Sequence, residues 1–291
     1  MRHARLERAL RRRSSRTRLG RFLGNRRLLL GLVLVAGIAL VAVVGPYLAP
    51  DPNAIVLRNR SIAPFAQGFG QSPLGTDQLG RDMLSRIVYG ARISLTVGVV
   101  STVVAALVGA VLGMVAGFFG GKTEFGIMRV TDLIMCYPFT ITSIIAAALL
   151  APGIKTIILI FSAFGWTSYC RVIHGVALSV KQELYVEASR AVGASSGWIL
   201  WKHILPGILP SLVVSATLQV RQMILGEATL SFLGIGIQPP TPSWGVLIST
   251  GREYLSTAWW ISTLPGIALA VLILGFSLLG DGLTDYLNPR L

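Results

Sequence analysis

The sequence carries little charge for its length. Of its 291 residues only 13% are charged, and just 12 are acidic, whereas about 25% of the residues of a soluble domain are charged. Hydrophobic residues make up 53% of the chain, and the mean hydropathy is +0.68. Such a chain has too few polar side chains to cover a surface in water, so a bilayer is its natural solvent. The composition therefore predicts a membrane protein rather than the two soluble domains that the length alone would allow.

Residue types that carry chemistry are also scarce. The two cysteines, Cys136 and Cys170, lie in separate apolar stretches, and the three histidines lack the spacing of metal ligands. Neither the phosphate-binding pattern G-x-x-x-x-G-K-[ST] nor the metalloprotease pattern H-E-x-x-H occurs. We therefore expect no disulfide framework, no metal site, no bound cofactor and no catalytic residue. Any ATP that drives this protein must be hydrolysed by other chains.

Basic residues are plentiful but gathered at one end of the chain. The formal net charge is +14, and 11 of the 26 basic residues lie in residues 1–27, beside a single acid, Glu7. The others are scattered between apolar runs, without the repeated basic face or stacking aromatics of a nucleic-acid-binding surface. We expect the 1–27 tail to stay in the cytoplasm, following the Lys/Arg bias of membrane proteins. There it contacts anionic lipid rather than nucleic acid, with regulation by a partner as the alternative role.

Six apolar runs are long enough to span a bilayer, which takes about 20 residues. In chain order they cover residues 28–48, 93–119, 126–150, 155–178, 207–235 and 260–279. We interpret the first as a retained span rather than a secretory signal, because no small-residue cleavage site follows it. With the tail inside, six spans return the C-terminus to the cytoplasm. The prediction is an all-α polytopic membrane protein with a basic tail at 1–27, a first span at 28–49, an extracytoplasmic segment at 50–92 and a five-helix core at 93–291.

The most informative stretch is a cytoplasmic loop at 183–206, which reads YVEASRAVGASSGWILWKHILP from Tyr185 onward. It is too polar to span the membrane. A helix with small side chains is expected before Gly193, where the backbone can turn, and Pro206 ends or kinks a second short helix. A connection of this length is usually functional or disordered, and its apolar content argues against disorder. We therefore expect a helix–turn–helix element whose small-residue face, next to Glu187, packs into a groove on another protein.

This stretch resembles the EAA loop of bacterial ABC-importer permeases, in which E-A-A is followed by three residues, Gly, nine residues and I-x-L-P. The positions that match the pattern are Glu187, Ala188, Gly193, Leu205 and Pro206. Two positions depart from it: Ser189 replaces the second Ala, and His203 stands where Ile is usual. The resemblance implies the fold of a type I ABC-importer permease, with six transmembrane helices and a cytoplasmic coupling helix.

The resemblance also implies how that helix works. In the family it docks into a cleft of an ATPase subunit, and ATP-driven closure of two ATPases rocks the spans between inward-facing and outward-facing states. The positions that take ATPase-coupling roles by this resemblance are Glu187, Ala188, Ser189 and Gly193, with Leu205 and Pro206 as the hinge into the fifth span.

Three further stretches are similar to the C-type permease of the dipeptide/oligopeptide/nickel importer family. They are residues 74–98, 227–245 and 278–291. The similarity implies a subunit of the bacterial cytoplasmic (inner) membrane that takes up short peptides, with nickel or another small solute as the alternative cargo. It also implies four kinds of partner: membrane lipid, a second related permease, an extracytoplasmic substrate-binding protein, and two ATPase subunits or one fused ATPase that bind ATP and Mg.

Charged residues outside the coupling loop have more than one interpretation. Asp77, Arg81 and Asp82 either pair locally and stiffen the extracytoplasmic segment, or contact the substrate-delivery protein. Residues 85–92 mix apolar side chains with arginines, which predicts a stretch along the outer membrane interface. Within the spans, Arg129 and Asp132 lie three residues apart and are expected to form a local ion pair.

Arg221 and Glu227 are the intramembrane charges with most bearing on function, because a charge at membrane depth is costly and usually faces the bundle interior or a cavity. They are six residues apart on one span, so they point to different faces. Each either bonds a polar group on a neighbouring helix or lines the translocation path. Under the second interpretation Glu227 meets a peptide amine and Arg221 a carboxylate.

A membrane-embedded enzyme and a passive channel are the rival classes. An enzyme needs clustered His, acidic or nucleophilic side chains, whereas the acids here are spread one or two to a segment. A channel has no need of the docking element at 187–193. Both classes are therefore disfavoured against a transporter subunit.

Overall fold

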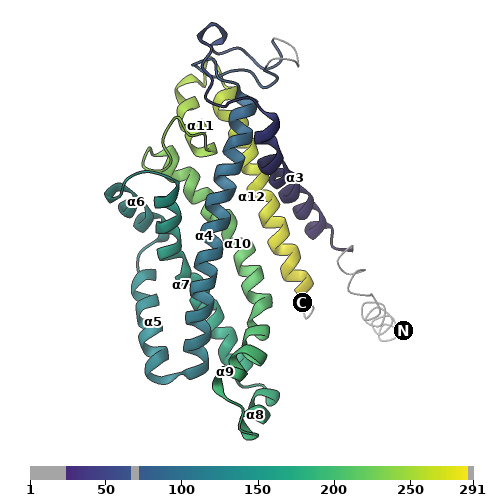
Figure 1. The fold of residues 1–291 in the computed structure, drawn as a ribbon, viewed down its shortest axis with the longest axis vertical. Helices are drawn as coiled ribbons and strands as arrows, with labels where there is room; N and C mark the ends of the chain where they lie inside the picture. The colour runs from purple at the N-terminus through teal and green to yellow at the C-terminus, as the bar shows by residue number, and fades with distance from the viewer. Residues whose placement is uncertain (1–23, 67–71, 288–291) are drawn as a thin grey trace, which may run out of the picture.

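The computed structural model describes residues 24–66 and 72–287, and within them the chain is a bundle of helices (Figure 1). The β-structure in that part of the chain amounts to an isolated bridge between Thr76 and Asp82. The basic tail predicted at 1–27 lies almost wholly outside the described residues, so its role stays a prediction.

Six membrane-spanning units in the described residues match the six apolar runs. Five are single helices, and the third is a pair of helices joined by a sharp bend. Their bounds are α3 Arg26–Leu48, α4 Met83–Phe119, α5 Gly121–Met135 with α6 Phe139–Leu149, α7 Ile154–Lys181, α10 Leu205–Phe232 and α12 Trp260–Leu287. The N-terminal end of α3 and the C-terminal end of α12 point toward the end of the molecule where α8, Leu184–Ala191, lies (Figure 1). The predicted all-α, six-span fold is confirmed.

Shorter helices fill the connections between the spans. On the side opposite α8 they belong to the segments after α3 and after α10 (Figure 1). The bounds of these helices are η1 Leu57–Asn59, α11 Trp244–Gly251 and η3 Arg252–Tyr254. Two further short helices, α9 Ser196–Ile199 and η2 Leu200–Ile204, lie between α8 and α10 in the chain.

The second span begins earlier than the sequence predicted. Helix α4 starts at Met83 because Asp82 caps it, accepting a hydrogen bond from the Ser85 backbone N–H at 2.7 Å. Residues 85–92 are therefore the first turns of a 37-residue helix, about 55 Å long at 1.5 Å per residue. The prediction that this stretch lies along the membrane interface is wrong, since Ser85 and Arg86 are buried within the protein.

The third span is broken rather than continuous. Helices α5 and α6 meet at an angle of 79°, with Pro138 as the residue that precedes α6. Proline has no backbone N–H and keeps the residue before it, Tyr137, out of helical geometry. The prediction of one helix over 126–150 is therefore wrong at its centre.

The second short helix of the 183–206 loop does not end at Pro206. Helix α9 passes through the π-helical turn η2 into α10, so residues 196–232 run on as one apolar rod. The Leu205 N–H bonds to the Leu200 carbonyl oxygen, five residues back. A π turn of this kind accommodates a register change inside a helix, and Pro206, which has no backbone N–H to donate, follows directly after it.

Small residues let α4 and α7 pack closely against each other. Gly109, Gly113 and Gly117 recur every fourth residue along α4, on the side that faces α7. A Cβ atom at Gly113 would lie 2.5 Å from the Cys170 carbonyl oxygen. This small-xxx-small spacing is typical of close helix packing in membranes, and it makes α4 the central element of the fold.

Candidate functional site

Helix α8 lies beyond the ends of α4 and α7 (Figure 1) and is docked on the bundle through one side. Val186 is fully buried, in a cluster that includes Ile199 and Ile204 of the following rod. The guanidinium carbon of Arg190 lies 5.2 Å from the centre of the Phe118 ring at the end of α4, within cation–π range. One face of α8 is thus fixed against the core.

The other side of α8 is exposed. Glu187 and Ala188 are both open to solvent, and Leu184 and Val192, at the two ends of the helix, are 81% and 85% exposed. Leu184, Glu187, Ala188 and Val192 lie three, four and eight residues apart, so they share one side of the helix. The face therefore offers an acidic group, a small side chain and two apolar ends to another protein.

Gly193 makes the turn that the sequence predicted. Its φ of 84° lies in the left-handed region, which a glycine adopts without a steric penalty. The Ala194 N–H donates to the Ser189 carbonyl oxygen at 3.0 Å, and the Gly193 N–H donates to the Arg190 carbonyl oxygen at 2.9 Å. This pair of bonds is a Schellman cap, so α8 ends at a defined residue and turns back toward α9.

Residues 193–197 read GASSG and match the G-x-S-x-G pattern that surrounds the nucleophilic serine of some hydrolases. In those hydrolases the serine stands on a sharp turn between a strand and a helix. Here Ser195 follows the helix α8 and caps α9, its side-chain oxygen accepting a hydrogen bond from the Trp198 N–H at 3.3 Å. The serine has a structural role in the turn.

The charged residues Asp77, Arg81 and Arg86, in the segment predicted at 50–92, pair among themselves. The Asp77 carboxylate accepts bonds from the Leu79 and Arg81 backbone N–H groups, both at 2.9 Å, and from Arg81 Nε at 2.6 Å. Arg86 Nε lies 3.6 Å from the same carboxylate. Asp77 is 1% and Arg81 6% exposed, while Asp82 is used in capping α4. The predicted local pairing is therefore confirmed for Asp77 and Arg81, and their burial argues against the alternative, a direct contact with a delivery protein.

Glu227 is enclosed by hydroxyl groups. It is fully buried, and its carboxyl oxygens accept hydrogen bonds from Ser94 Oγ on α4 and Ser231 Oγ on α10, each at 2.8 Å. Ser231 Oγ in turn accepts a bond from the Ile237 N–H at 3.0 Å. The prediction that Glu227 lines the path is wrong in this structure, whereas its alternative, a bond to a neighbouring helix, is confirmed.

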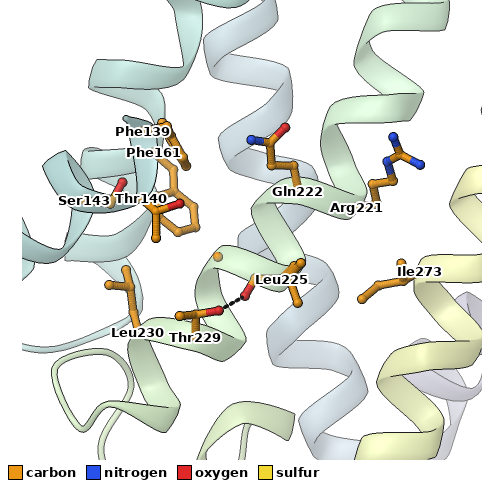
Figure 2. A pocket seen from close by; sticks show the side chains of 11 residues that line it. Phe139, Thr140, Ser143, Phe161, Arg221, Gln222, Leu225, Thr229, Leu230 and Ile273 are labelled. Atoms are coloured by element: carbon orange, nitrogen blue, oxygen red, sulfur yellow. Dashed lines mark hydrogen bonds between the residues drawn. The ribbon is translucent and has the colours of Figure 1, made fainter. Parts of the chain in front are cut away.

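Arg221 lies instead at the edge of a cavity of about 450 Å³ between α6, α7, α10 and α12. In Figure 2, Phe139 and Phe161 stand opposite Gln222, which follows Arg221 on α10. Arg221 Nη1 donates to Ser277 Oγ on α12 at 3.0 Å, and the side chain is otherwise exposed. The interpretation in which Arg221 bonds a polar group on a neighbouring helix is therefore confirmed. Its place in the translocation path stays a prediction, which its position at the edge of this cavity favours.

Two side-chain contacts that spacing along a single helix does not predict join α5 to α7. Asp132 pairs with Arg171, and Glu124 Oε1 lies 2.7 Å from His174 Nε2. The predicted pair of Asp132 with Arg129 is wrong, because the Arg129 guanidinium lies over an aromatic ring of its own helix. Arg171 and His174 share a face of α7, three residues apart, and that spacing is the signal that could have indicated the pairing.

The chain is similar to transport permeases along nearly its whole length. Residues 109–291, more than half of the chain, match the model of the binding-protein-dependent transport system inner membrane component, and residues 16–64 match the N-terminal TM domain of oligopeptide transport permease C. A di/tripeptide transport system permease of Pseudomonas aeruginosa is 35% identical over 93% of this chain and 90% of its own length. The dipeptide permease of Haemophilus influenzae is 36% identical over 93% and 92%, and the nickel permease of Escherichia coli 36% over 90% and 94%.

A solved structure has the same fold. An inward-facing MetNI methionine ABC transporter chain superposes with a TM-score of 0.58 at 19% identity, covering 71% of this chain and 98% of that chain.

Proposed function

This chain belongs to the family of binding-protein-dependent transport system inner membrane components, and we propose that it is the C-type half of the permease of a short-peptide importer. It is a multi-pass permease subunit of an ABC importer in the bacterial inner membrane. We place α8 and both termini in the cytoplasm, and we assign ATP and Mg to separate ATPase chains. A second related permease completes the path, and an extracytoplasmic binding protein delivers the cargo.

The observation that carries this proposal is the arrangement of α8. The helix is fixed to the bundle by the buried Val186 and capped by Gly193, while Glu187 and Ala188 face outward. The following rod runs from α9 without interruption into α10. A push on the exposed face is therefore transmitted to a membrane-spanning helix, which is what coupling to an ATPase requires.

Ala188→Arg tests the coupling role. The long side chain fills the small-residue face, and overpacking of a fitted contact costs about 1–3 kcal/mol. Because Ala188 is exposed, the chain itself should fold as before. ATP-dependent peptide uptake by the complete complex in proteoliposomes is expected to fall about tenfold or more, with an unchanged melting temperature.

Ala188→Ser is the matched control, because it keeps the side chain small and should transport like the wild type. If Ala188→Arg also transports like the wild type, the face centred on Ala188 does not contact the ATPase.

The peptide cargo is supported by the peptide permeases among the relatives. The nickel permease among them favours a nickel complex as the second candidate. Mass spectrometry of the ligand that purifies with the binding protein decides between them. Short peptides are expected, and a metal chelate would overturn the peptide assignment.

Arg221 is proposed as a path residue that meets the cargo carboxylate. Its cavity is lined by both aromatic and polar side chains, and a charge-assisted bond is worth enough that Arg221→Gln should lower peptide uptake roughly tenfold. Ser277→Ala removes the neighbour that Arg221 bonds but keeps the cation. Uptake should therefore persist in Ser277→Ala, and an equal loss in both variants would assign Arg221 a structural role only.

A further inference from the structure

The two positions at which this chain departs from the EAA pattern are in contact with each other. Ser189 on α8 and His203 in η2 are 14 residues apart, and Ser189 Oγ lies 2.9 Å from His203 Nε2. Where the pattern has an alanine and an isoleucine, this chain has a polar pair. Because the two substituted residues contact each other, we look for one role that both of them serve.

The direction of the bond follows from the proton count. Ser189 Oγ also lies 2.8 Å from the Tyr185 carbonyl oxygen, one turn back on α8, and donates to it. A hydroxyl has one proton to donate, and that proton is used on Tyr185. Ser189 Oγ therefore accepts from His203, which must carry its proton on Nε2.

Aromatic rings hold the His203 imidazole in place on both sides of the loop. Its centre is 5.2 Å from the Tyr185 ring of α8 and 5.1 Å from the Trp198 ring of α9, the latter edge-on at 81°. These separations are within the range of favourable ring contacts. The imidazole thus links α8 to the helix that continues from α9 into α10.

We propose that Ser189 and His203 are a positioning pair that fixes the angle between α8 and the α9–α10 rod, and so sets how much of the movement of α8 reaches the membrane. A hydrogen bond is directional, whereas the apolar contact of an alanine with an isoleucine is not. The pair therefore resists rotation of α8 about its anchor at Val186. This inference rests on the coupling role proposed above.

The test is a double-mutant cycle in the complete importer complex, with two measurements. Ser189→Ala and His203→Ile each leave one partner without its bond, whereas the combined variant restores an apolar pair. Hydrogen exchange of the amides in 184–191 measures how firmly α8 is held. Transport per ATP hydrolysed, in proteoliposomes, measures coupling.

Each single variant is expected to speed exchange and to lower transport per ATP by about three- to tenfold. The double variant should recover at least half of the loss in both measurements. His203→Gln keeps a side-chain N–H donor and should also recover part of it.

Ser179→Ala is the matched control. Ser179 Oγ donates to the Gly175 carbonyl oxygen one turn back, at 3.2 Å, and the side chain is exposed on α7. Removing it deletes the same kind of intrahelical bond as in Ser189→Ala, without touching α8. Neither measurement should change.

The outcomes separate the pair from the function. The positioning pair is overturned if hydrogen exchange is unchanged in both single variants. It is also overturned if the double variant loses as much as the losses of the two single variants added together. A cycle that shows the expected exchange pattern, in a complex without ATP-dependent peptide transport, supports the pair and overturns the proposed function.

Discussion

Replacing Gly113 by leucine is expected to prevent the chain from accumulating as a folded protein. A Cβ atom at this position would lie 2.5 Å from the Cys170 carbonyl oxygen and 3.0 Å from the His174 backbone nitrogen. Both are main-chain atoms of α7, so neither can swing aside as a side chain would. The two helices would have to separate along the contact that Gly109 and Gly117 also make.

The cost should exceed the usual price of overpacking, about 1–3 kcal/mol, because the strain falls on two backbones. Membrane-extracted protein should elute largely as aggregate in size-exclusion chromatography, and any monodisperse fraction should melt well below the wild type. Gly175→Leu on α7 is the matched control. It has no heavy atom within 4 Å of its Cβ position and should behave as the wild type does. A Gly113→Leu chain that melts within about 2 °C of the wild type would refute the close packing of α4 on α7.

Glu227→Leu is expected to give the second large loss of stability. The substitution leaves Ser94 and Ser231 without the acceptor that each bonds at 2.8 Å. A buried polar group that loses its partner costs about 1–3 kcal/mol. The melting temperature of the purified chain should fall by roughly 5–10 °C, because the carboxyl group that bonds Ser94 of α4 to Ser231 of α10 is lost.

Three variants make this prediction specific. Glu227→Gln keeps the shape and can still accept and donate, so it should lose much less than Glu227→Leu. Adding Ser94→Ala to Glu227→Leu removes one of the unpaired hydroxyls and should restore part of the stability. Glu253→Leu removes an exposed acid and should leave the melting temperature unchanged. Equal melting of Glu227→Leu and the wild type would show that the hydroxyl cluster does not hold these elements together.

Local features of the 183–206 loop can be predicted from the sequence alone. Gly193 was expected to turn the backbone and does so, because its left-handed φ is a property of that residue type. The exposed positions of Glu187 and Ala188 also follow from a polar, small-residue stretch between apolar runs. The contact between Ser189 and His203 was not predicted, because it depends on how two short helices fold back across a turn.

Partners of charged residues were the least predictable feature. Asp132 was assigned to Arg129 by spacing along one helix, yet it pairs with Arg171, which lies 39 residues away in the chain. Glu227 likewise bonds Ser94, 133 residues away. Spacing rules describe neighbours on one helix, whereas these pairs are created by the packing of two.

The sequence by itself determined the six apolar runs that are long enough to cross a membrane and the place of the helix–turn–helix element at 183–206. Those features rest on local quantities: the length of an apolar run against the thickness of a bilayer, and the turn-forming chemistry of single residues. Only the tertiary structure decided where α4 begins, how sharply the third span bends at Pro138 and which buried polar groups meet. Such choices depend on the distances between helices, and in membranes those distances are set by the close packing of small residues on neighbouring helices.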